Sequence, residues 1–441
     1  MADQEVLGLD IGTSRIKFVE LGPGRNGPVV LNAGIGLTPR DAISNGVIVE
    51  PDALGDAVRQ LLDEHGVRLK NVISSVASQS SLVVRPIQVP RMTRQELDET
   101  MQWEVERHIP FAASEVVVSF QPMVAPEELP PETQNMDVLL AVAQEDMVNA
   151  HVETLFRAGL EPVALDVEPL AACRSLIDID REVGSYEQTY ALLNMGAGTT
   201  DLSIIHNGLL TFTRPVPLAG DNITNAIAET LGYEFHEAER VKLERGELYL
   251  NGTPALAAPS TPEPPPAPTP EEDEAGPTST LDLEQEAGAA PAGPGEGEGP
   301  SPQVFDLGAE TGAPPPLPGE PPSTIMPALH RPGAGTPERQ VYEAMLPTLT
   351  EMVTEVRRSI EYYVNRFPDS RVDKVLVYGG TARLRQFPEF LANEIGLPVV
   401  LGNPFVRLEV DASRVSAEFV SENACFMPIV VGLALRDMLG D

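Results

Sequence analysis

A turn near the N-terminus carries residues suited to hold phosphate. The apolar run Val6 to Ile11 contains one acid, Asp10, and leads into Gly12-Thr13-Ser14 and a second apolar segment with Lys17. This pattern predicts a β-hairpin whose tight turn exposes backbone N–H groups and two hydroxyls. Gly12 lets an anion approach the backbone because it has no Cβ. Asp10 offers the oxygen ligand that a hard cation beside phosphates requires.

The same chemistry recurs in the middle of the chain. Residues 190–205 form an apolar strand, the turn Gly196-Ala197-Gly198-Thr199-Thr200 and a returning strand, with Asn194 and Asp201 on either side of the turn. Two such hairpins, about 185 residues apart, indicate a duplicated architecture with one hairpin in each half.

A third motif ends a short buried-type strand. Residues 374–381 read Lys-Val-Leu-Val-Tyr-Gly-Gly-Thr, so the strand runs into the glycine pair Gly379-Gly380. A flat base can lie against backbone that carries no side chains.

These motifs, in this order, resemble the actin-like ATPase superfamily, which includes actin, heat-shock chaperones, sugar kinases and FtsA. The resemblance implies an α/β fold with two lobes around a nucleotide cleft, and ATP and Mg²⁺ as cofactors. The residues that it assigns to phosphate are Gly12, Thr13, Ser14, Lys17, Gly196, Gly198, Thr199 and Thr200. It assigns ribose and base to Glu239 and Lys242, places Gly220 at the turn and helix start before them, and matches Gly379 and Gly380 to the adenosine motif. It assigns the metal to Asp10 and Asp201, and the positioning of the attacking water to Glu168.

One residue departs from the superfamily pattern. The superfamily usually has Asp where this chain has Asn194. A neutral amide does not supply a second carboxylate beside the metal. Nucleotide binding is expected to survive this change, whereas hydrolysis is expected to be slow or absent.

A separate block of strands and helices is predicted between the first two motifs. Leu82 to Pro90 alternates as a strand, and Thr93 with Glu96 forms a capping box that begins a helix. The run Trp103 to Phe111 resembles the PilM family of type IV pilus assembly proteins, which like FtsA carry their own subdomain here. The resemblance implies that this subdomain forms one wall of a groove for the short cytoplasmic N-terminal tail of PilN, an inner-membrane pilus protein. Trp103 either packs on a neighbouring subdomain or lines that groove.

Composition limits the other partners. The 441 residues carry a net charge of −36, which argues against nucleic acid and anionic membrane as partners. No signal peptide is evident, no apolar run reaches the roughly 18 residues of a membrane span, and the two cysteines fit buried thiols in a reducing cytosol. The chain ends at Asp441 without a basic amphipathic tail, which favours PilM over FtsA. We therefore expect a cytoplasmic protein, without direct membrane insertion, attached to the inner membrane through PilN and other pilus platform proteins.

One long segment has the composition of a disordered region. Residues 251–336 are rich in Pro, Gly, Ala and Glu, and cannot bury enough apolar surface to offset the entropy of ordering. Val304 to Leu307 and Ile325-Met326 are candidate partner-binding islands within it.

The motifs and the composition together predict the order of the parts. They are the core of lobe 1 (1–83), the inserted subdomain with the candidate partner groove (84–165), the connecting helix and return to lobe 1 (166–193), lobe 2 (194–250), the disordered insertion (251–336), the completion of lobe 2 with the adenosine motif (337–380) and a C-terminal segment that returns to lobe 1 (381–441). Three local features are also predicted: a strand pair over residues 29–50, a long helix that kinks or restarts at Pro347, and a last helix from Phe426 to Met438.

Two other functions stay open at this level. An FtsA- or MreB-like filament former would share the motifs, so self-association is a further possibility. A sugar-kinase-type phosphotransferase would need a catalytic base in a motif of its own before the second hairpin, and no such motif is evident.

Overall fold

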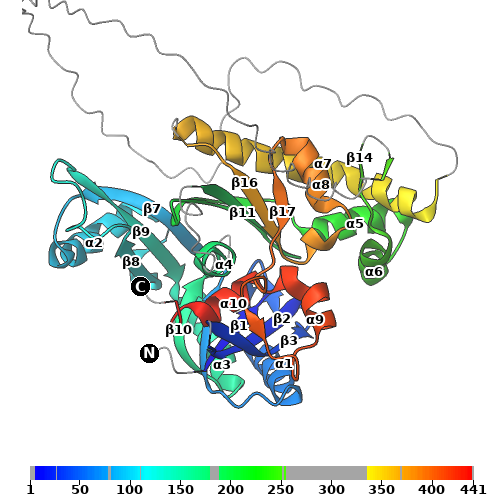
Figure 1. Ribbon diagram of the computed structural model, residues 1–441, viewed down its shortest axis with the longest axis horizontal. Helices are drawn as coiled ribbons and strands as arrows, with labels where there is room; N and C mark the ends of the chain where they lie inside the picture. Colours follow the sequence, from blue (N-terminus) through cyan, green and yellow to red (C-terminus); the bar gives the residue numbers. More distant parts are fainter. Residues whose placement is uncertain are drawn as a thin grey trace, which may run out of the picture. The chain divides into compact units, whose positions relative to one another are not determined.

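Two sheets of matching topology carry the two predicted hairpins (Figure 1). The computed structural model describes residues 5–25, 27–77, 81–109, 111–178, 188–250, 253–254, 335–367 and 370–439. All of these residues belong to one unit of the chain, formed by residues 1–256 and 316–441. The predicted disordered insertion, including its two islands, lies outside the described residues except at 253–254 and 335–336.

The first sheet has six strands in the order β10-β6-β1-β2-β3-β18. β1 pairs antiparallel with β2 and parallel with β6, and Asp10 lies opposite Lys17 across the hairpin. The predicted N-terminal hairpin is therefore confirmed. The strands are β1 Val6–Ile11, β2 Arg15–Pro23, β3 Pro28–Leu37, β6 Asn71–Val76, β10 Glu161–Val167 and β18 Glu409–Val410.

The second sheet, in the order β13-β12-β11-β16-β17, repeats this pattern. β11 pairs antiparallel with β12 and parallel with β16, as β1 does with β2 and β6, so the predicted duplication is confirmed. Asn207 and Gly208 both have positive φ in the turn from β12 to β13, as a type I′ turn requires. The strands are β11 Thr189–Met195, β12 Thr200–His206, β13 Leu209–Val216, β16 Lys374–Tyr378 and β17 Val399–Leu401.

The inserted block folds as a three-stranded sheet with its own helix. Its strands are β7 Leu82–Pro90, β9 Asn135–Gln144 and β8 Val116–Pro122, in the order β7-β9-β8. The helix α2 (Arg94–His108) begins at the predicted capping box, where Thr93 accepts from the Glu96 backbone and Glu96 accepts from Thr93. A 3₁₀ turn, Ala113–Glu115, precedes β8.

Helices cover both faces of the two main sheets. α1 (Pro51–Glu64) and α3 (Glu145–Arg157) share a core with one face of the first sheet. α4 (Glu168–Cys173) and α10 (Pro428–Leu435) pack against the inner face of the second sheet, and α10 also packs on the other face of the first. α4 continues into a π-helical turn, Arg174–Asp178. Cys173 in α4 and Cys425 in the turn before α10 are both buried thiols, as predicted.

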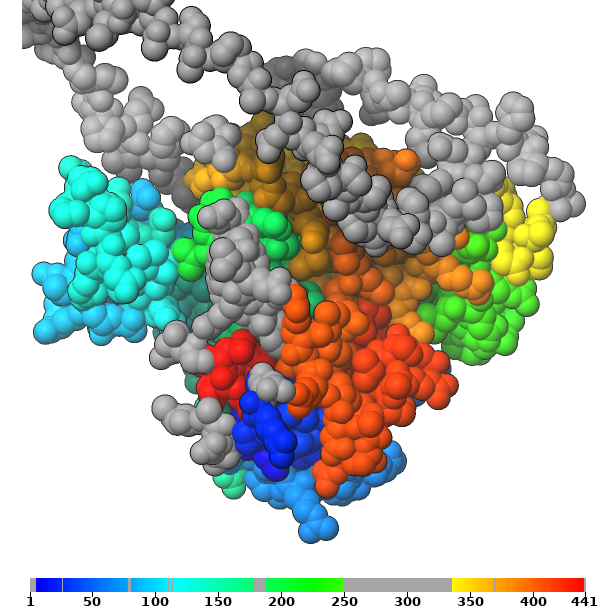
Figure 2. Space-filling view, viewed as in Figure 1, coloured from blue at the N-terminus to red at the C-terminus, as the bar shows by residue number. Residues whose placement is uncertain are grey.

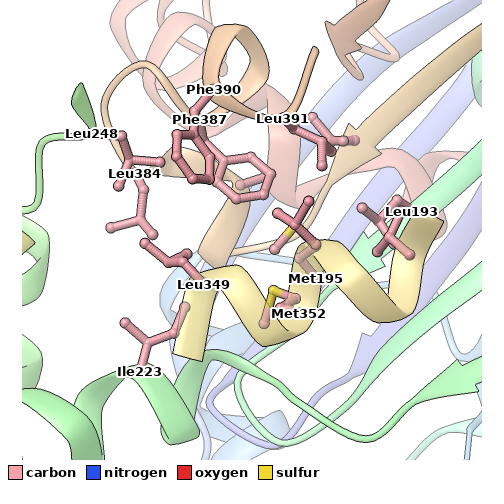
Figure 3. Close-up of a cluster of buried hydrophobic side chains, with 14 of the residues drawn as sticks. Leu193, Met195, Ile223, Leu248, Leu349, Met352, Leu384, Phe387, Phe390 and Leu391 are labelled. Carbon is pink, nitrogen blue, oxygen red and sulfur yellow. The ribbon is translucent and has the colours of Figure 1, made fainter. Parts of the chain in front are cut away.

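The outer face of the second sheet supports the largest core. Leu193 and Met195 on β11 meet Leu349 and Met352 on α7 in the cluster drawn in Figure 3. The helices that close this core are α5 Gly220–Leu231, α6 Phe235–Arg245, α7 Pro337–Arg366 and α8 Phe387–Ile395. The strand β16, which leads into the glycine pair Gly379-Gly380, is thereby held between two helical layers.

Three predicted local features agree with the structure only in part. α7 is continuous through Pro347, so the alternative that a new helix begins there is wrong, and the one missing backbone hydrogen bond is offset by the buried apolar stripe of the helix. Residues 29–50 contain the predicted strand pair as a short hairpin, β4 Ile43–Ser44 with β5 Val47–Ile48, whereas residues 29–37 belong to the long strand β3. The predicted last helix, Phe426 to Met438, is present as α10, which begins at Pro428 and ends at Leu435 and is therefore shorter at both ends. It is preceded by α9 (Ala417–Asn423) and a 3₁₀ turn (Ala424–Phe426), from which α10 is bent by 94°.

The C-terminal residues return to the first sheet. β18 pairs parallel with β3, and Figure 2 shows the red and orange C-terminal residues against the blue N-terminal ones. A minor hairpin joins β14 (Tyr249–Leu250) to β15 (Thr253–Pro254), and a 3₁₀ turn (Thr381–Arg383) follows β16. Among the described helices, none alone has the length and apolar composition of a membrane span, although the bent pair Ala417–Phe426 with Pro428–Leu435 passes on these two criteria.

Candidate functional site

The two hairpins open onto one cleft, with an empty volume of about 1040 Å³ including its mouth. Residues from both sheets line it, so neither half of the chain completes the site alone. Of the predicted site residues, those that line the cleft are Asp10, Gly12, Thr13, Ser14, Lys17, Glu168, Gly196, Thr199, Glu239, Lys242, Gly379 and Gly380.

The first hairpin has a closed turn with an ion pair at its base. The Gly12 N–H donates to the Arg15 carbonyl over 3.0 Å, and the Thr38 hydroxyl donates to the Gly12 carbonyl over 2.6 Å. Lys17 Nζ lies 2.6 Å from Asp10 Oδ2, and the Asp10 side chain is almost wholly buried. The acid predicted to face a metal is therefore balanced by the hairpin's own lysine.

The second hairpin faces the first at close range. A Cβ added to Gly198 would lie 3.0 Å from the Thr13 hydroxyl, so the two turns approach each other across the cleft. The Gly196 N–H donates to the Thr199 carbonyl over 2.9 Å, and the Gly196 carbonyl accepts from the Gly220 N–H and the Thr381 hydroxyl. These contacts tie the second turn to the start of α5.

Four predicted site residues lie beside the cleft lining rather than in it. Gly198 meets Thr13, and Gly220 packs so closely on Gly196 that a Cβ there would lie 3.0 Å from its carbonyl. Thr200 is fully buried on β12. Asp201 pairs in register with Asn194 and faces a second cavity behind the cleft.

Three acids approach one another where the cleft ends. The amide of Asn194 donates to Glu168 Oε2 over 2.8 Å. Burial, together with the charges of Asp10 and Asp201, raises the pKa of Glu168 to about 8. Burial also raises the pKa of Asp201 to about 6. At the end of the cleft, carboxyl groups that are protonated or neutralised by a cation are therefore favoured over ionised, unpaired carboxylates.

These carboxylates fit a metal that reaches the cleft together with phosphates. Within the described ranges, no group of three or more His, Cys, Asp or Glu side chains is arranged to hold an ion by itself. Mg²⁺ commonly binds through one or two carboxylates plus the phosphates of its ligand. Asp10 lines the cleft beside the first turn and suits that arrangement, whereas Asp201 lines the second cavity.

The predicted base side contains a buried ion pair. Lys242 Nζ lies 2.6 Å from Glu239 and donates to the Gly220 carbonyl and the Thr224 hydroxyl. Lys242 is only 5% exposed, so it is not a solvated charge on the surface of α6. Gly379 has φ of +93°, and a Cβ there would lie 2.5 Å from the Met195 carbonyl, so glycine is required at this turn.

Several cleft residues are not predicted from the motifs. Arg15, Thr381 and Phe426 all line the cleft. Arg15 and Thr381 directly follow predicted motif residues, so adjacency in sequence was a usable signal for them. Phe426 comes from the C-terminal segment, and no local pattern marks it.

The second cavity has an empty volume of about 1000 Å³ and shares one wall with the cleft. Glu168, Asn194 and Tyr378 line both spaces. The inserted subdomain supplies another wall of the second cavity through Val84 and its neighbours on β7. Trp103 is 74% exposed, so the prediction that it packs on a neighbouring subdomain is wrong.

Known proteins share both the sequence pattern and the fold. The family model for type IV pilus assembly protein PilM matches residues 8–251, and that for cell division protein FtsA matches residues 191–421. FtsA of Bacillus subtilis (strain 168) is 26% identical over 265 residues, 55% of this chain and 58% of FtsA. FtsA of Streptococcus pneumoniae is 28% identical over 275 residues, 58% of each chain. The chain thus covers less than two thirds of the length of these relatives.

A solved structure matches along the whole chain. In the PilM–PilN type IV pilus biogenesis complex, one chain superposes with a TM-score of 0.71 and 25% identity, covering 99% of both chains. The inserted subdomain and the two sheets are therefore shared as one arrangement.

Proposed function

The chain belongs to the PilM family of type IV pilus assembly proteins and has the actin-like ATPase fold, and from this we propose that it is an ATP-binding scaffold of the pilus inner-membrane platform. The observation that carries the nucleotide part is the approach of the two hairpins, with Gly198 facing Thr13 across the cleft. Two turns that present N–H groups and hydroxyls to one space suit a chain of phosphates.

The residues have separate tasks in this proposal. Thr13, Ser14 and Thr199 bind phosphate oxygens at the two turns, and Gly379-Gly380 borders the base. Mg²⁺ bound with the phosphates would offset the negative charge of Asp10 and of the acids behind it. Glu168, with its raised pKa, carries a proton near neutral pH and holds its hydrogen bond with Asn194, which favours stable binding over rapid hydrolysis.

We further propose that the partner is the cytoplasmic N-terminal tail of a PilN-type protein, which would attach this chain to the inner membrane. The matching solved structure is a complex of PilM with PilN. The inserted subdomain here offers an exposed tryptophan on α2 and one wall of the second cavity. Because that cavity shares Glu168 and Asn194 with the cleft, nucleotide and tail have a physical route for coupling.

Nucleotide binding is tested by adding a methyl group where the two hairpin turns approach each other. Gly198→Ala is expected to weaken MgATP binding about tenfold, because the new methyl overpacks against Thr13 where the phosphates would lie. Isothermal titration calorimetry measures the affinity. Gly36→Ala is the matched control, since its methyl meets only Leu61 side-chain atoms. Parent protein that fails to bind MgATP at millimolar concentration contradicts the proposal.

Partner binding is tested at the exposed tryptophan. Trp103→Ala is expected to weaken binding of a synthetic PilN tail from the same organism at least tenfold, since exposed tryptophans often dominate interfaces. Stability should change little because the ring is 74% exposed. Phe235→Ala, which removes an exposed aromatic ring from α6, is the control. Fluorescence anisotropy measures the affinity, and equal binding by parent and Trp103→Ala would remove α2 from the partner surface.

A further inference from the structure

The two lysines of the cleft are already neutralised by carboxylates. Lys17 lies 2.6 Å from Asp10, and Lys242 lies 2.6 Å from Glu239. Lys242 also donates to a backbone carbonyl and to the Thr224 hydroxyl. A polyanion that enters the cleft therefore meets ion pairs at both lysines and must compete with their carboxylates.

Arg15 lines the same cleft without such a partner. Its side chain is half-buried at the start of β2, and no described carboxylate lies within ion-pair distance of it. Its guanidinium instead lies over the Phe426 ring, 5.3 Å from the ring centroid. Arg383, from the turn after β16, lies over the same ring at 5.2 Å.

Phe426 is held in this position from several sides. The ring is 9% exposed, and a Cβ added to Gly380 would lie 3.1 Å from its edge, so the glycine pair makes room for it. The two arginines reach the ring from opposite halves of the fold, Arg15 from the first sheet and Arg383 from beyond the second. The ring thus orients an uncommitted cation at the rim of the first phosphate turn.

We propose that Arg15 is a phosphate-binding residue of the cleft, stacked on Phe426 until a nucleoside di- or triphosphate enters. The inference rests on the proposed nucleotide function and adds a contact that the motifs do not contain. Stacking on a phenylalanine is a weak interaction for a guanidinium, whereas a bidentate contact with phosphate is strong, so phosphate would displace the ring as partner. Arg383 is absent from the cleft lining and serves to keep the ring in place.

The experiment compares ligands with and without phosphates. Arg15→Met keeps the methylene stem and removes the charge, so binding of MgATP, MgADP and inorganic tripolyphosphate is expected to weaken about ten- to hundredfold. Adenosine, which carries no phosphate, should bind with unchanged affinity. Arg15→Lys is expected to recover part of the loss, because a point charge replaces the planar fork.

The matched control is Arg383→Met, which removes the other cation from the same ring. Its MgATP affinity should stay within about threefold of the parent, since a side chain outside the cleft makes no phosphate contact. Arg15→Met with parental MgATP affinity, or with an equal loss for adenosine, overturns the inference. Parent protein that binds neither MgATP nor adenosine overturns the nucleotide function itself, so the two failures are distinguishable. Thermal melting of each variant checks that the fold is kept.

Discussion

Replacing Asn194 with Asp is expected to destabilise the nucleotide-free protein by about 3 kcal/mol at pH 8.5, the size of an uncompensated buried charge. Asn194 now donates its amide to Glu168 Oε2 over 2.8 Å. A carboxylate in its place would accept rather than donate, and it would join Asp10, Glu168 and Asp201 where burial already raises the pKa of Glu168 and Asp201. Urea unfolding of parent and variant without nucleotide measures the difference.

The stability loss in Asn194→Asp should depend on pH, because the buried carboxyl groups change protonation between about pH 4 and 8. The Glu168 pKa is about 8 in the folded protein against 4.5 unfolded, so its stabilising protonation is complete below pH 4.5 and lost as pH rises to about 8. Asp201 acts in the same direction between about pH 4 and 6. In Asn194→Asp, Glu168 can share its proton with the new carboxylate at pH 6 but not above pH 8. The difference in free energy of unfolding between parent and Asn194→Asp should therefore increase from pH 6 to pH 8.5.

Two further measurements separate this cause from general damage at position 194. Glu168→Gln should flatten the pH dependence of the parent, and adding it to Asn194→Asp should remove most of the variant's extra loss at pH 8.5. Saturating MgATP should stabilise Asn194→Asp more than the parent, because ligand and cation bind the folded state where negative charge is in excess. Equal stability of Asn194→Asp and parent at pH 8.5 would show that the acids do not interact as described.

The parts predicted correctly are those with local signals. Each hairpin combines apolar strands with a glycine turn, and the Thr93 capping box depends on residues three apart, so short windows of sequence were sufficient. The start of the last helix was placed two residues too early, because the apolar residues run on without interruption through Pro428. A helix pattern alone does not reveal the burial of Lys242, because it does not show which carbonyl will face a given amine.

The features that the sequence did not predict depend on contacts between segments far apart in the chain. The stacking of Arg15 on Phe426 joins residues from opposite ends of the chain, and nothing near Phe426 marks it as a cleft residue. The exposure of Trp103 depends on what the inserted subdomain leaves uncovered, which its helical pattern does not specify. The close approach of Gly432 to the backbone of Ala171 is likewise not evident from the sequence, because Gly432 lies within a helix and not in a turn.

Gly432→Ala is expected to lower the free energy of unfolding by about 3 kcal/mol or more, at or beyond the upper end of the usual cost of overpacking. A Cβ at this position of α10 would lie 1.7 Å from the Ala171 carbonyl oxygen and 2.9 Å from Ala171 Cα. Both are backbone atoms of α4, so no side-chain rotation relieves the clash, and the two helices would have to separate. The midpoint of urea unfolding measures the loss.

The consequence should reach the site because both helices border it. α4 begins with Glu168, and α10 begins two residues after Phe426, so separating the helices would shift the acid and the ring on which Arg15 stacks. Any Gly432→Ala protein that still folds should therefore bind MgATP more weakly than the parent. Gly36→Ala is the matched control, because its new methyl meets only flexible Leu61 atoms at 3.2 Å or more. Equal unfolding midpoints for Gly432→Ala and Gly36→Ala would mean that α4 and α10 do not pack as closely as the structure shows.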